Sequence, residues 1–168
     1  MAKIIIIAAV AQNNVIGNKG GIPWHIKEDF AFFQRTTMGY ACIMGDRTYD
    51  SLPAKVRPLP GRENIILTRN DSYQAPGATI LHSWQDMLST IKDREKVFLC
   101  GGATVYSLGL ACADELYITH VQKSFEGDTF FPDIDNTQWQ VQVTEKSEGK
   151  NLLTDETIPL HFVTYVRK

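Results

Sequence analysis

The chain has 168 residues, of which 43% are hydrophobic and 21% charged, a composition typical of one ordinary globular domain. Its 17 Lys and Arg against 19 Asp and Glu give a net charge of −2, and no basic run exceeds two residues, which argues against nucleic acid as a partner. Three cysteines without a C-x-x-C pair and four scattered histidines argue against both a disulfide framework and a metal site.

The first segment, MAKIIIIAAVAQ, superficially resembles a secretory signal peptide, because a lysine precedes a short apolar run. The run carries a single charge, at Lys3, and is dominated by β-branched isoleucine, and the turn-prone residues 12–14 follow it. A buried first strand explains these features better. The sequence therefore predicts a cytoplasmic protein that does not associate with membranes.

Short apolar runs rich in β-branched residues alternate with helical patterns along most of the chain. The runs lie at 4–11, 41–44, 64–68, 79–81, 97–100 and 115–121, and the helical patterns at 26–37, 47–52, 84–92 and 103–111. Strand–helix–strand order with strands apolar on both faces is typical of an α/β sheet. From Trp139 onward, apolar and polar residues alternate without an intervening helix, which predicts an antiparallel hairpin. We expect one domain, 1–168: a mixed sheet of about eight strands, mostly parallel, with an antiparallel C-terminal hairpin and about four flanking helices.

The predicted helix at 26–37 begins with two acids that point in different directions. On a helical projection Glu28 faces solvent, whereas Asp29 lies at the margin of a buried stripe. That stripe consists of Ile26, Phe30, Phe33 and Thr37. An acid in a first helical turn usually does no more than favour the helix dipole. Asp29, however, leans on apolar side chains and has no Arg or Lys on its face, so a ligand with N–H donors is a suitable partner, and loss of solvation would raise its pKa.

Two strand–glycine–helix junctions indicate phosphate binding. VFLCGGATVYSLG and ACIMGDRTYDSL place Gly101-Gly102 and Gly45 where the N–H groups of a helix start suit a phosphate. Either junction alone also fits a tight turn without a ligand, because the full G-x-G-x-x-G pattern is absent. NIILTRN adds Thr68 and Arg69 at a strand end, which suit the additional phosphate that distinguishes NADP from NAD, although Arg69 alone is equally typical of a solvated loop edge.

Beyond these patterns, the chain resembles dihydrofolate reductase. The segments that carry the resemblance run in order from Ile4 to Pro132: AAVAQNNVIGNKGGIPWHIKEDFAFFQRTT, IMGDRTYDSL, RPLPGRENIIL, CGGATVY, LYITHV and EGDTFFP. The resemblance implies NADPH-dependent reduction of 7,8-dihydrofolate to 5,6,7,8-tetrahydrofolate, a step that supports one-carbon metabolism and thymidylate synthesis. It also implies an adenosine-binding lobe at roughly 40–95, a cytoplasmic monomer and a target for antifolate inhibitors.

The resemblance also implies residue roles. Asp29 would bind the pterin amino group and promote protonation of the imine, Thr119 would support Asp29, and Trp24 would hold a bridging water. Substrate contacts would come from Ile7, Ala8, Asp29, Phe33, Leu52, Leu59, Arg62, Cys100, Tyr106 and Thr119, with Arg62 on the glutamate carboxylate. Cofactor contacts would come from Ala9, Ile16, Gly17, Gly20, Gly21, Gly45, Asp46, Arg47, Thr48, Thr68, Arg69, His82, Gly101, Gly102, Ala103, Thr104, Val105 and Tyr106. Residues 12–24 would form a mobile loop braced by 127–128, and a cis peptide is expected at 101–102.

Four positions depart from the family pattern. Asp46 and Thr104 stand where arginine is common, and Gln34 replaces a frequent basic residue near the substrate tail. About three extra residues around 54–56 precede the Pro-Leu-Pro turn. The change at Asp46 removes a phosphate contact that a neighbouring arginine must replace, so the strength of the preference for NADPH over NADH stays open.

Two other functions fit parts of the same pattern. One is a reductase of similar fold acting on a pyrimidine intermediate of flavin synthesis, which needs ribose-phosphate contacts in place of Phe33 and Arg62. The other is a nucleotide-binding module without catalysis. Oxidation of NADPH on addition of dihydrofolate distinguishes all three.

Overall fold

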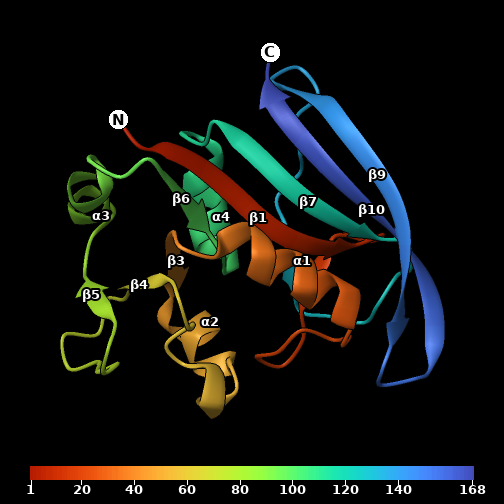
Figure 1. Ribbon diagram of the computed structural model, residues 1–168, viewed down its shortest axis with the longest axis horizontal. Coiled ribbons are helices and arrows are strands. Elements are labelled where there is room, and N and C mark those ends of the chain that lie inside the picture. Colours follow the sequence, from red (N-terminus) through yellow and green to blue (C-terminus); the bar gives the residue numbers. More distant parts are fainter.

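The computed structural model describes residues 1–168 as a mixed eight-stranded sheet, a separate two-stranded sheet and four α-helices (Figure 1). The strands are β1 (Lys3–Ala11), β2 (Val15–Gly17), β3 (Ala41–Gly45), β4 (Glu63–Leu67), β5 (Thr79–Leu81), β6 (Lys96–Leu99), β7 (Glu115–Val121), β8 (Thr129–Phe130), β9 (Trp139–Asn151) and β10 (Glu156–Arg167). The helices are α1 (Lys27–Thr37), α2 (Asp46–Ser51), α3 (Trp84–Ile91) and α4 (Ala103–Leu110), with a 3-10 turn, η1, at Ala54–Val56. No helix has both the length and the apolar character that a membrane span requires.

The order of the large sheet is β5-β4-β3-β6-β1-β7-β10-β9. Neighbouring strands from β5 to β7 pair in parallel, whereas β10 pairs antiparallel with both β7 and β9. The predicted mixed sheet with an antiparallel C-terminal hairpin is confirmed. The prediction missed the two-stranded sheet of β2 and β8, since strands of three and two residues are too short to show a period.

Strand β1 lies inside the sheet and is covered on both faces. Ile5 and Ile7 pack towards Phe33 of α1, whereas Ile6 packs towards Val105 of α4. Figure 1 shows the same arrangement, with α1 in front of β1 and α4 behind it. Alternate side chains of one strand thus enter two different cores, which explains the unbroken apolar run in the sequence.

Helix α1 buries most, but not all, of the predicted stripe. Ile26 and Thr37 are fully buried and Phe33 is half-buried, as predicted. The prediction for Phe30 is wrong, because that side chain is 41% exposed and its ring lies 4.9 Å from the ring of His25.

Phe30 is exposed because α1 packs on the sheet through the face that carries Phe32 and Phe33. The Phe32 ring lies 4.7 Å from Phe162 of β10, and Phe33 packs in the core beside β1. Asp29 precedes these two residues by three and four positions, so it lies on the same face of the helix. The buried face of α1 is thus rotated towards Asp29. Phe30 therefore lies outside this face, and the carboxyl group of Asp29 points inward.

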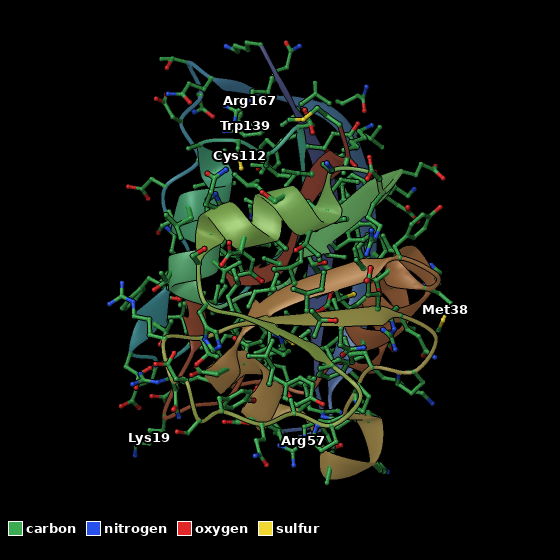
Figure 2. The ribbon with its side chains drawn as sticks, turned by 90° about the vertical axis from the view of Figure 1, so that its left-hand side faces the viewer. Lys19, Met38, Arg57, Cys112, Trp139 and Arg167 are labelled. Atoms are coloured by element: carbon green, nitrogen blue, oxygen red, sulfur yellow. The ribbon has the colours of Figure 1, made fainter.

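The end of β10 is fixed against α4. The guanidinium of Arg167 lies 4.2 Å from the centre of the Trp139 ring and donates hydrogen bonds to the carbonyls of Ala113 and Leu110 at 2.9 and 2.7 Å. Figure 2 shows Arg167 and Trp139 together at one end of the molecule, with Lys19 at the other. The C-terminal strand is therefore held at the end remote from the loop that carries Lys19.

The turn between β9 and β10 holds the backbone that precedes α1. Helix α1 has Ile26 as its N-cap and receives no side-chain cap. Instead, the buried Asn151 Oδ1 accepts hydrogen bonds from the N–H groups of His25 and Leu153 at 3.0 and 3.2 Å, and Leu152 N donates to His25 O at 2.8 Å. Asn151 thus fixes the entry into the helix that carries Asp29.

Replacing Asn151 with alanine should lower the free energy of unfolding by about 1–2 kcal/mol, because two N–H groups lose a buried acceptor. Urea unfolding followed by far-UV circular dichroism measures the change. Asn136→Ala is the matched control, since Asn136 is exposed and its side chain makes no hydrogen bond within the protein. Equal midpoints for the Asn151→Ala protein and its parent would contradict this role.

Candidate active site

A cavity of about 1190 Å³ runs along the carboxyl ends of the parallel strands, the edge at which open α/β sheets bind ligands. All 18 residues predicted to contact the cofactor line this one cavity. The lining also includes seven residues that were not predicted to contact a ligand: Ile22, Leu67, Ser83, Trp84, Leu108, Asp128 and Thr129. Ser83 and Trp84 follow the end of β5, which was itself predicted as a strand, so their position was a signal that could have found them.

The two glycine junctions meet inside the cavity. Gly45 N donates a hydrogen bond to Gly101 O at 2.9 Å, and the Gly101–Gly102 peptide is cis, as expected. A Cβ atom on Gly102 would lie 3.3 Å from Thr48 Oγ1, so the glycine keeps the cavity wall open. Helix α4 starts here without a side-chain cap, which leaves its first N–H groups free for an anion. These features fit the diphosphate of a dinucleotide.

The polar groups after β4 and β5 form one end of the cavity. Thr68 Oγ1 donates a hydrogen bond to Asp46 Oδ2 at 2.7 Å, and His82 Nδ1 lies 2.9 Å from Thr68 O. Arg69 is exposed and forms no ion pair within the protein. An anionic group of a ligand is therefore a suitable partner for Arg69.

The residues predicted to enclose the substrate rings form a continuous apolar wall. Phe33 and Cys100 belong both to the cluster around Ile7 and to the cluster around Leu59, against which Leu52 also packs. Cys100 lines the large cavity as well, so the apolar wall and the cavity adjoin. Together they provide space for a flat ring beside a dinucleotide.

Arg62 lies at the rim of this wall without an acidic partner. Its guanidinium lies 5.8 Å from the Phe33 ring and donates to the hydroxyl of Thr37 at 3.2 Å and to the carbonyl of Pro60 at 2.9 Å. No carboxylate of the protein pairs with it. A carboxylate of a ligand can therefore bind there.

Asp29 is an acid held against apolar residues without a cationic partner. No lysine, arginine or histidine forms an ion pair with it. Burial raises the pKa of Asp29 to about 6, and hydrogen bonding with the Thr119 side chain partly opposes this shift. Thr119 is fully buried on β7, directly opposite Ala9 of β1.

Strand β1, which packs against α1, is tied to α4 on its other side. The hydroxyl of Tyr106 donates to Ile7 O at 2.9 Å, which connects α4 to the centre of β1, and Ala8 is buried in the same strand. The strand on which the helix of Asp29 packs is therefore held from its far side.

The loop at 12–24 covers the cavity and is braced by the segment around β8. Asp128 accepts a hydrogen bond from Lys19 N at 3.0 Å, and its own N–H donates to Gly17 O at 3.0 Å. A Cβ atom on Gly127 would lie 2.6 Å from Gly17 O, so the segment approaches the loop too closely for a side chain. The loop ends at the buried Trp24, whose ring lies 4.9 Å from that of Phe125.

Comparison with known proteins gives the same fold and function class. The family model described as Dihydrofolate reductase matches residues 3–167. The chain belongs to the dihydrofolate reductase family. The resemblance to this family that the sequence shows is therefore confirmed over nearly the full length of the chain.

Individual members of the family agree over the whole chain. It is 42% identical to the dihydrofolate reductase of Neisseria gonorrhoeae, with all of both chains covered. It is 38% identical to dihydrofolate reductase type 3 of Salmonella typhimurium, over 94% of this chain and 96% of that one. The solved structure of the Enterococcus faecalis dihydrofolate reductase, in complex with NADP(H) and RAB-propyl, superimposes with a TM-score of 0.88 at 34% identity, covering 99% of this chain and 96% of that chain.

The positions that depart from the family pattern lie on the surface or in the cavity. The extra residues form the turn η1, which has no buried residue, and Gln34 lies on the exposed side of α1. Thr104 and Asp46 line the cavity. None of these four positions contributes to the apolar wall around Asp29.

Proposed function

We propose that the chain reduces 7,8-dihydrofolate to 5,6,7,8-tetrahydrofolate with NADPH, where the apolar wall adjoins the large cavity. The observation that carries this proposal is Asp29, a half-buried acid with a raised pKa and no cationic partner in the protein. The complex of the Enterococcus faecalis relative with NADP(H) supports the choice of cofactor.

Asp29 recognises the substrate ring. An ionised carboxylate accepts two parallel N–H bonds, which a pterin offers through its amino group and the adjacent ring nitrogen. Ile7, Phe33 and Cys100 pack on the ring and exclude water, and Arg62 holds the glutamate carboxylate at the rim. This arrangement orients dihydrofolate with its imine towards the cavity.

The residues of the cavity hold and orient the dinucleotide. The junction at Gly101-Gly102 and the start of α4 would bind the diphosphate, and Arg69 would contact the phosphate on the adenosine ribose within the lobe at 40–95. Ala9 and Ile16 would contact the nicotinamide side. When bound, NADPH supplies the hydride that reduces the imine.

Asp29 also promotes the proton step. Because its pKa is raised to about 6, a proton shared between the carboxyl group and the pterin is retained close to neutral pH. Thr119 fixes the carboxyl group, and Trp24 holds a water that relays the proton to the imine. The braced loop at 12–24 keeps other water out of the site.

The decisive assay follows absorbance at 340 nm with NADPH and dihydrofolate. Loss of absorbance that requires both dihydrofolate and the protein supports the proposal. A loss that requires a ribosylated aminopyrimidine instead would identify a pyrimidine reductase. Binding of NADPH without any consumption would identify a nucleotide-binding module, and both of these results would overturn the proposal.

We further propose that the enzyme works as a cytoplasmic monomer and is inhibited by antifolates that present a 2-aminopyrimidine to Asp29. The lining of the cavity is complete with residues of one chain, which supports a monomer. All three cysteines are free, which fits a reducing compartment. Sedimentation at assay concentrations tests the first part, and competition with dihydrofolate tests the second.

A further inference from the structure

One acid lies among the basic groups at the end of the large cavity. Asp46 begins α2 and lines the cavity together with Thr68 and Arg69, which follow β4, and His82, which follows β5. Asp46 follows β3, which stands two positions from β1 in the sheet, or roughly 10 Å at the usual strand spacing, and Thr68 and His82 follow β4 and β5 still further out. Asp46 therefore lies on the side of the cavity that leads away from β1.

The contacts of Asp46 are hydrogen bonds from neutral groups and include no cation. Asp46 Oδ2 accepts from Thr68 Oγ1 at 2.7 Å, and Asp46 Oδ1 accepts from Arg47 N at 2.7 Å. Neither Arg47 nor Arg69 lies within ion-pair distance of it. The negative charge is thus exposed to whatever group a ligand places at this end of the cavity.

The same contact also occupies the hydroxyl of Thr68. Its only proton is donated to Asp46, and its oxygen accepts from Asn70 N at 3.1 Å. A phosphate needs donors, so Thr68 offers it none while this hydrogen bond persists. A ribose hydroxyl is a better match, because it can donate to the free lone pairs of the Asp46 carboxylate.

We propose that Asp46 is a specificity-determining residue of the cofactor site, which weakens binding of a dinucleotide with a phosphate on its adenosine ribose and favours one with a free ribose hydroxyl. This inference rests on the proposed function, because it assumes that the cavity binds such a dinucleotide. Arg69 attracts the phosphate and Asp46 opposes it, so the parent protein distinguishes the two cofactors only weakly.

The test compares Asp46→Asn with the parent by calorimetric titration with NADPH and with NADH at low ionic strength. Loss of a like charge near the phosphate should tighten NADPH binding about tenfold. The affinity for NADH should stay the same or fall, since asparagine is a weaker acceptor for a ribose hydroxyl. The ratio of the two dissociation constants therefore moves about tenfold or more towards NADPH.

Asp86→Asn is the matched control, because Asp86 is exposed on α3 near the same end, does not line the cavity, and its carboxylate makes no hydrogen bond or ion pair. It removes the same charge and should leave the ratio unchanged. A ratio that does not move in Asp46→Asn, or that moves equally in both variants, overturns the inference. Because the titration needs no turnover, a parent that binds both cofactors but does not reduce dihydrofolate would overturn the proposed function and leave this test valid.

Discussion

Replacing Asp29 with asparagine should slow reduction of dihydrofolate by about 10²- to 10⁴-fold at pH 7, the usual effect of removing a positioned acid–base group. Asparagine keeps the size of the side chain but neither carries the charge that binds the ring nor shares its proton. Because the site is otherwise intact, NADPH should bind with an affinity close to that of the parent. Steady-state rates at 340 nm and a separate cofactor titration measure the two effects.

The pH dependence distinguishes this role from a general loss of structure. In the parent, turnover should fall as pH rises through and above about 6, where the carboxyl group with its raised pKa loses its proton. The parent rate should level off below about pH 6, whereas in Asp29→Asn the rate should keep increasing towards acid pH with no midpoint near 6, because only solution protons then reach the imine. Glu28→Gln is the control, since Glu28 is the neighbouring acid on the exposed side of the helix. A fast Asp29→Asn enzyme at pH 7 would refute the mechanism.

The same substitution should make the protein more stable at pH 8, by about 1–2 kcal/mol. Burial raises the pKa of Asp29 from 3.8 to about 6, which corresponds to an upper limit of about 3 kcal/mol of destabilisation when the group is ionised. Residual solvation, and the cost of burying the asparagine amide, reduce the gain. A protein that gains stability as it loses activity indicates a site selected for function.

The sign of the pH effect follows from proton binding. Between the unfolded pKa near 3.8 and the folded pKa near 6, the folded state binds more protons, so the parent loses stability as pH rises through this window. The two proteins should therefore unfold at similar urea concentrations at pH 4 and differ fully above pH 7. A stability difference that is the same at pH 4 and pH 8 would show that ionisation of Asp29 is not its cause.

The sequence was sufficient to predict the elements whose hydrophobic period is long enough to read. The strands at 79–81 and 115–121 were predicted at their observed bounds, and the helix at 26–37 within one residue. The face of that helix was predicted less well. Phe30 is exposed because the sheet lies towards Phe32 and Phe33, a direction set by tertiary packing and not by the helix period.

The site was predictable where a local motif carries the chemistry. Glycine junctions and the inward acid are visible as short patterns, and the structure brings the glycines together around one cavity. The hydrogen bond from Thr68 to Asp46 was not predictable, because it joins the ends of two strands 22 residues apart. The same holds for Asn151, which reaches the start of α1 from 126 residues away. Such contacts depend on how strands are ordered in the sheet.

The most direct test of the central claim is an NMR titration of carbon-13-labelled aspartate carboxyl groups in the protein without ligands. One resonance, absent from the Asp29→Asn spectrum, should titrate with a pKa of about 6. Addition of an antifolate with a 2-aminopyrimidine ring should hold that carboxyl group ionised well below pH 6, because the N–H donors of the ring stabilise the ionised carboxylate. If the Asp29 resonance titrates near 3.8 without ligand and does not respond to the antifolate, the acid is neither sheltered nor directed at the substrate, and the account is contradicted.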